Sequence, residues 1–127
     1  MNTITPPERL NHPLPSPTLV IDFATVRDEL ERESPLSAGA HTAKTLVKQP
    51  EMRIVLVVMK SGSVLKEHQA EARISVQTLS GCIRFRAAGE TTELPTGKLL
   101  VCDKKVPHEV EALEDSTFLL SLFRQES

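Results

Sequence analysis

A chain of 127 residues, of which 39% are hydrophobic, lies in the size range of one domain and can bury a core of ordinary size. Its 15 basic and 17 acidic residues give a net charge of −2 with both signs mixed along the sequence, and it contains neither Trp nor Tyr. Nucleic-acid binding is therefore not expected, because it depends on clustered basic residues or stacking aromatics. A membrane span is not expected either, since the longest apolar run, Ile54 to Met59, is far short of the roughly 20 residues that a spanning helix needs.

Residues 1–20 are expected to form an irregular, proline-rich arm. Five of the nine prolines fall within the first 17 residues, and each removes a backbone donor and restricts the residue before it. The arm has no apolar stretch of the signal-peptide type, which favours a cytoplasmic protein. Cys82 and Cys102 are too few for a disulfide framework and are expected to stay thiols. Residues 21–127 would then form a single domain.

One short helix is expected at the start of this domain. Phe23, Val26 and Leu30 recur at helical spacing, Asp22 can cap the first turn, and Pro35 ends the pattern together with the following glycine. The polar face of this helix is expected to be solvated and carries Arg27, Asp28, Glu31 and Arg32.

From residue 44 onward the pattern is that of β-strands. Short runs rich in Val, Ile, Leu and Thr are separated by turn signals about every ten residues. The expected strands are Lys44–Lys48, Met52–Met59, Arg73–Leu79, Cys82–Ala87, Thr91–Leu94, Leu99–Cys102, Glu109–Leu113 and Thr117–Phe123. No crossover helices separate them, so the fold is predicted to be all-β, an antiparallel sandwich or jelly-roll barrel.

Two of these strands are apolar on both faces. Ile54–Met59 and Phe118–Phe123 are nearly continuous apolar runs, whereas Arg73–Leu79 alternates between apolar and polar residues. A strand covered on both faces of a small β domain lies either in a sandwich interior or at a dimer surface. Together with the arm, these runs predict a homodimer.

The stretch from Gly62 to Gly81, GSVLKEHQAEARISVQTLSG, resembles the first motif of the cupin superfamily. Both glycines and His68 stand at motif positions. The places of the second His and of the Glu are taken by Ala70 and Ile74.

The stretch from Gly97 to Ala112, GKLLVCDKKVPHEVEA, resembles the second motif. Gly97 and His108 match it, while Asp103, Lys105 and Ala112 replace its Pro, Gly and Asn. The resemblance covers roughly the C-terminal two-thirds of the chain. It implies a small single-domain cupin, which is an antiparallel double-stranded β-helix (jelly-roll) barrel, here with one short N-terminal helix.

The resemblance also implies a site centred on His68 and His108. Cupins that hold a metal present three His and one carboxylate, a shell suited to iron, manganese, zinc, nickel or copper. With only two imidazoles carried over, a metal would be weakly held. Ala70 and Ile74 make the pocket more apolar, which suits a small-molecule ligand. Gln77, on the strand of Ile74, would join the site only if a bulge reversed its parity.

Three functions stay open at this point. The first is a small cytoplasmic, homodimeric cupin that binds a small molecule in its barrel and has a degenerate metal site. The second is a metal-dependent enzyme, an oxygenase or isomerase, in which water or another side chain completes the metal shell and an imidazole of His68 or His108 acts as general base. The third is a sensory or scaffold module without a ligand.

Overall fold

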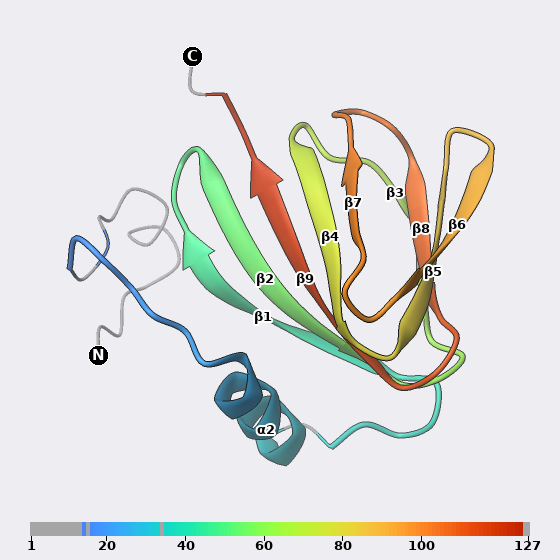
Figure 1. The fold of residues 1–127 in the computed structure, drawn as a ribbon, viewed down its shortest axis with the longest axis horizontal. Helices are drawn as coiled ribbons and strands as arrows, with labels where there is room; N and C mark the ends of the chain where they lie inside the picture. Colours follow the sequence, from blue (N-terminus) through green and yellow to red (C-terminus); the bar gives the residue numbers. More distant parts are fainter. Residues whose placement is uncertain (1–13, 15, 34, 126–127) are drawn as a thin grey trace.

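The computed structural model describes residues 14, 16–33 and 35–125 (Figure 1). Most of the predicted arm, residues 1–13 and residue 15, therefore lies outside the described part of the chain. Within that part, no helix is long and apolar enough to cross a bilayer.

The predicted helix is confirmed as α2, Phe23–Glu33. Asp22 caps it as expected, since its Oδ1 accepts hydrogen bonds from the backbone N–H groups of Ala24 at 3.1 Å and Thr25 at 3.4 Å. These two N–H groups have no partner inside the helix, so the aspartate satisfies them.

The rest of the described chain folds into strands. They are β1 (His41–Lys48), β2 (Met52–Met59), β3 (Val64–His68), β4 (Arg73–Ser80), β5 (Cys82–Ala87), β6 (Glu90–Pro95), β7 (Leu99–Cys102), β8 (His108–Ala112) and β9 (Ser116–Phe123). The eight predicted strands are all present with small shifts in their ends. The sequence analysis missed β3, which is short, lies at a sheet edge and includes two charged residues, Lys66 and Glu67.

Two antiparallel sheets face each other and enclose the core (Figure 1). The strand order is β1-β2-β9-β4-β7 in the five-stranded sheet and β3-β8-β5-β6 in the four-stranded sheet. Both sheets supply side chains to one interior cluster, which includes Met59, Val76, Ile83, Phe85 and Phe118. This arrangement confirms the all-β jelly-roll barrel with one short helix.

Helix α2 covers part of the outer face of the five-stranded sheet. Leu30 of the helix packs with Leu56 and Val58 of β2 in a second buried cluster, while Val57 and Met59 point into the barrel core. Partly buried side chains complete the second cluster, namely Phe23, Val26, Leu36, Leu46, Leu79 and Leu119. The helix thus explains why β2 is apolar on both faces, and this strand does not require a second subunit to cover it.

The strands define two ends of the barrel, which we call the mouth and the base. At the mouth, the loop after β3 meets the loop before β8, where the N–H of Lys105 donates to the carbonyl of Ala70 at 2.8 Å. At the base, the turn after β2 meets the turn before β9, where the N–H of Ser61 donates to Oδ1 of Asp115 at 2.8 Å.

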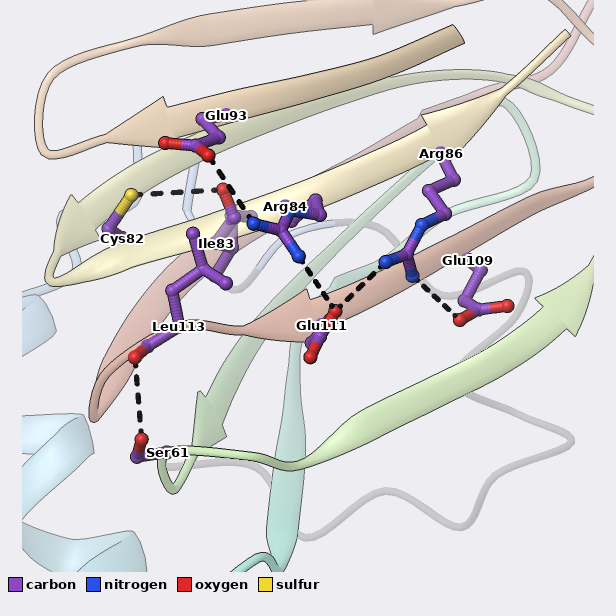
Figure 2. A network of polar contacts seen from close by, with 9 residues as sticks. All are labelled: Ser61, Cys82, Ile83, Arg84, Arg86, Glu93, Glu109, Glu111 and Leu113. Carbon is purple, nitrogen blue, oxygen red and sulfur yellow. Dashed lines mark hydrogen bonds and ion pairs between the residues drawn. The ribbon is translucent and has the colours of Figure 1, made fainter. Parts of the chain in front are cut away.

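The outer face of the four-stranded sheet carries a ladder of ion pairs (Figure 2). Arg84 lies 3.4 Å from Glu93 and 3.5 Å from Glu111, and Arg86 lies 3.1 Å from Glu109 and 3.2 Å from Glu111. The acidic positions of β8 therefore face basic positions of β5, which is a favourable cross-strand arrangement. Because the ladder joins two arginines to three glutamates, it presents no surplus of positive charge to a nucleic acid.

Gly81 is required by the close approach of the turn after β4 to the start of β9. Its φ is +84°, and a Cβ built on it would lie 2.3 Å from the carbonyl oxygen of Asp115 and 2.4 Å from Oγ of Ser116. That hydroxyl bonds to both the N–H and the carbonyl of Cys82, at 3.0 and 3.1 Å, so it cannot move away without losing these contacts. Gly62 has a similar φ of +86° but no atom within 4 Å of the built Cβ.

These two glycines form a matched pair for a stability test. Gly62→Ala is expected to lower the free energy of unfolding by about 1–2 kcal/mol, because a side chain at positive φ is strained. Gly81→Ala adds the steric clash and is expected to cost roughly 1–3 kcal/mol more. Urea unfolding of both variants measures the difference. Equal losses would show that the approach of Asp115 and Ser116 is not what requires a glycine.

Candidate functional site

The two candidate histidines lie on neighbouring strands at the mouth. In the pairing of β3 with β8, Leu65 stands opposite Val110 and His68 stands opposite His108. A regular antiparallel ladder would place residue 67 opposite His108, so β3 contains one extra residue between Leu65 and His68, a β-bulge. The bulge brings position 68 into register with position 108.

His108 is buried, with 4% of its surface exposed, on the face of β8 that also carries the core residues Val110 and Ala112. Its ring stacks on the ring of Phe85, with 5.4 Å between centroids and 16° between planes. Its Nδ1 lies 3.0 Å from the carbonyl oxygen of Val106. A carbonyl can only accept, so the neutral imidazole carries its proton on Nδ1, which makes Nε2 the acceptor nitrogen.

The other predicted site residues do not all gather here. Ile74 is 3% exposed in the interior cluster, and Ala70 packs against that cluster at the mouth. Gln77 instead has an exposed side chain, because it has the opposite parity to Ile74 on β4. The bulge that would have turned Gln77 inward is absent from the first part of β4, where residues 73–78 pair regularly with β9.

A hollow of about 220 Å³ opens beside Phe85, between the facing edges of the two sheets. We call it the mouth hollow. Its lining is mainly apolar and consists of Phe85, Ala87, Ala88, Glu90, Thr92, Leu100, Val101, Cys102, Asp103 and Val106. Sequence analysis did not single out these residues as a site.

Two titratable groups of the mouth hollow have shifted pKa values. Burial, and then the neighbouring Asp103 carboxylate, raises the pKa of the Cys102 thiol, which disfavours the nucleophilic thiolate. Hydrogen bonds from the Lys104 N–H and the Arg73 guanidinium, the latter at 2.9 Å, hold the pKa of Asp103 below its usual range. The rim of the hollow therefore carries a carboxylate that already has a partner.

The donor set at the histidine pair is small. Ala70 and Ile74 occupy the two remaining motif positions and have no side-chain donor atoms. Among the residues whose side chains the structure describes, no group of three or more His, Cys, Asp or Glu is arranged to hold a metal ion. The four motif positions therefore supply two imidazoles, those of His68 and His108, in place of three His and one carboxylate.

Comparison with known proteins gives matches among solved structures alone. No family model matches the chain, and no curated protein matches it. A cupin superfamily protein from Desulfitobacterium hafniense is 13% identical, covers 92% of this chain and 96% of its own, and has a TM-score of 0.68. A cupin 2 conserved barrel domain protein from Leptotrichia buccalis is 25% identical over 75% of this chain and 46% of its own, with a TM-score of 0.67.

A third similar structure is that of salicylate 1,2-dioxygenase from Pseudoaminobacter salicylatoxidans with gentisate adducts. It is 21% identical over 78% of this chain and 30% of its own, with a TM-score of 0.63. At these identities the likeness concerns the fold, and it agrees with the two facing sheets and with the matched motif positions. The chain has the fold of the cupin superfamily.

Proposed function

We propose that this protein binds a small, largely apolar molecule at the mouth of its barrel, beside His68 and His108. The observation that carries the proposal is the mouth hollow, which reaches Phe85, the residue on which His108 stacks. A mainly apolar hollow with a few polar groups at its edge is typical of small-molecule sites. Its volume of about 220 Å³ suits a molecule with one ring.

The same proposal includes a weakly held divalent transition metal, which could be iron, manganese, zinc, nickel or copper. His68 and His108 would hold it, with water in the remaining positions. Such an ion would polarise an oxygen of the bound molecule as a Lewis acid. The protein's own contribution is to keep His108 in one tautomer, through the carbonyl of Val106, and in one orientation, through Phe85.

Metal binding is tested with the purified, tag-free protein. We expect substoichiometric metal that a chelator removes, and zinc binding in titrations that weakens at least about tenfold in His108→Ala, because one of two imidazoles is lost. His68→Ala provides a second variant, which removes the other imidazole. His41→Ala is the control, since His41 contacts Ser63 at 3.1 Å and lies at the base.

Two outcomes would contradict a weakly held metal. Stoichiometric metal that survives chelation and disappears in His68→Ala would favour the alternative, a metal-dependent oxygenase or isomerase. Zinc binding that is unchanged in both His68→Ala and His108→Ala would remove the histidine pair from the site.

Ligand binding is tested by thermal unfolding in the presence of a library of single-ring molecules. A ligand at 100 times its Kd is expected to stabilise the folded protein by about 2.7 kcal/mol. Thr92→Trp should abolish the shift, because Thr92 lines the mouth hollow opposite Phe85. Thr91→Trp is the control, since Thr91 pairs with Arg86 on the outer face. A library without any stabilising member would instead support a sensory or scaffold module.

We also propose that the protein is a homodimer and that β7 forms its contact. The strand lies at the edge of the five-stranded sheet, where unpaired backbone groups can bond to another strand. Its outward residues Leu99 and Val101 are 60% and 63% exposed. Two copies of β7 that pair across a twofold axis would bury both side chains and extend the sheet.

Light scattering at micromolar concentration checks the oligomeric state. We expect the mass of a dimer for the unaltered protein and of a monomer for the double variant Leu99→Lys, Val101→Lys, because charges at this contact would repel. Thr91→Lys, at the edge of the other sheet, should remain a dimer. A monomeric unaltered protein would contradict the proposal.

A cytoplasmic location belongs to the same proposal. Cys82 and Cys102 are both free thiols in the structure, and burial raises the pKa of each. Unpaired cysteines are the usual state in a reducing compartment.

A further inference from the structure

A second hollow lies at the base of the barrel, where α2 meets the five-stranded sheet. We call it the base hollow, and its volume is about 190 Å³. Four elements meet around it: α2, the end of β2, the end of β4 and the start of β9. Its lining consists of Arg27, Glu31, Val58, Met59, Lys60, Ser80, Asp115, Ser116 and Thr117. It does not share a residue with the mouth hollow.

The base hollow carries both signs of charge. Arg27 and Glu31 stand four residues apart on α2, so they project from the same face of the helix. Lys60 comes from the turn between β2 and β3, and Asp115 comes from the turn between β8 and β9. Sequence analysis predicted a solvated polar face for this helix, and Glu31 and Arg32 are indeed exposed; in addition, Arg27 and Glu31 line the base hollow.

The cations of the base hollow retain capacity for a ligand. Lys60 Nζ lies 3.6 Å from Oδ2 of Asp115, and Arg27 lies 3.6 Å from Asp28. Both contacts are longer than a hydrogen bond. An ammonium group has three donors and a guanidinium has five. Each can therefore donate hydrogen bonds to a carboxylate that enters the hollow.

Asp115 is fixed in place as an anion. Its Oδ1 accepts the N–H of Ser61 at 2.8 Å. This hydrogen bond, followed by the Lys60 ammonium, holds the pKa of Asp115 below its usual range. Its other oxygen faces Lys60, and Glu31 supplies the second carboxylate from the helix.

We propose that the base hollow binds a small zwitterion, a molecule of the size of an α-amino acid that carries one carboxylate and one ammonium group. Arg27 and Lys60 receive the carboxylate, while Glu31 and Asp115 receive the ammonium. Ser80 and Thr117 add hydroxyl groups that can donate or accept. Val58 and Met59 provide an apolar part of the wall for an aliphatic side chain.

Both signs of charge within one small hollow favour this ligand over a simple anion. A phosphate would meet two carboxylates as well as two cations, and like charges repel at such distances. A zwitterion satisfies all four charged groups and adds no net charge. The proposal is independent of the mouth site, because the two hollows lie at opposite ends of the barrel.

The test compares L-valine with two molecules that each lack one of its charged groups. L-Valine carries both charges, isovalerate lacks the ammonium, and isobutylamine lacks the carboxylate. Each is titrated at millimolar concentration into the full chain, and amide shifts are followed by NMR. We expect saturable shifts at residues 58–60 and 115–117 with valine, and at least about tenfold weaker binding of the other two, which corresponds to about 1.4 kcal/mol per lost group.

Variants of the helix separate the two charges. Arg27→Gln and Glu31→Gln should each weaken valine binding about tenfold, because each removes one of the two groups that receive a charge of the ligand. Arg32→Gln is the matched control, because Arg32 belongs to the same helix but does not line the hollow. Arg27 and Glu31 lie outside the buried clusters, so these variants are expected to fold, which thermal unfolding verifies.

Three results would overturn the proposal. The first is the absence of saturable shifts at the base with valine. The second is isovalerate binding as tightly as valine, which would indicate a simple anion site. The third is an equal loss of valine binding in Arg32→Gln and Arg27→Gln. A negative result here leaves the mouth site unaffected, since shifts at residues 85–87 and 106–108 report on that site separately.

Discussion

Burial of the central strands on both faces is the constraint on which the rest of this structure depends. β2 and β9 contribute one face to the barrel core, and α2 covers part of their other face through Leu30, Leu56 and Val58. Two-sided burial stabilises the central strands in proportion to the apolar area removed from water. It also determines what remains open. The helix packs against β1 and β2, the outward leucine and valine of β7 stay exposed, and a polar hollow lies where the helix meets the base.

The mouth of the barrel depends on a local irregularity, not on the regular ladder. One extra residue in β3 sets His68 opposite His108. The aromatic ring of Phe85 and the carbonyl of Val106 then fix the orientation and the tautomer of His108. These are the supports that an imidazole needs in order to act as a ligand or as a base. They are present although Ala70 and Ile74, which stand at two of the four ligand positions of the cupin motifs, have no donor atoms in their side chains.

Charge is distributed differently on the three polar parts of the molecule. The outer face of the four-stranded sheet pairs Arg84 and Arg86 with three glutamates across neighbouring strands, which leaves one negative charge in excess (Figure 2). The rim of the mouth holds Asp103 in a contact with Arg73. At the base the corresponding contacts are longer, at 3.6 Å. The charged groups of the base hollow are therefore held less tightly by one another than Asp103 is by Arg73, which leaves them capacity for a small molecule.

The sequence alone was enough to predict eight of the strands and the capped helix, because both depend on local spacing: alternation along a strand and Asp22 before a helical run. It also singled out His68 and His108 as candidate site residues, because glycines stand at fixed distances from both. The alternation of side chains along β4 was also enough to predict that Gln77 and Ile74 point to opposite faces of the sheet. Other features depend on contacts between distant segments. The strand at 64–68 has a weak pattern of its own and exists because β8 pairs with it. Phe85 reaches His108 only once β5 and β8 have paired, and Arg27 reaches a hollow only once the helix has packed on the five-stranded sheet. The sequence pattern indicates on which face of its helix or strand a residue lies, whereas the packing of these elements decides which residues contact that face.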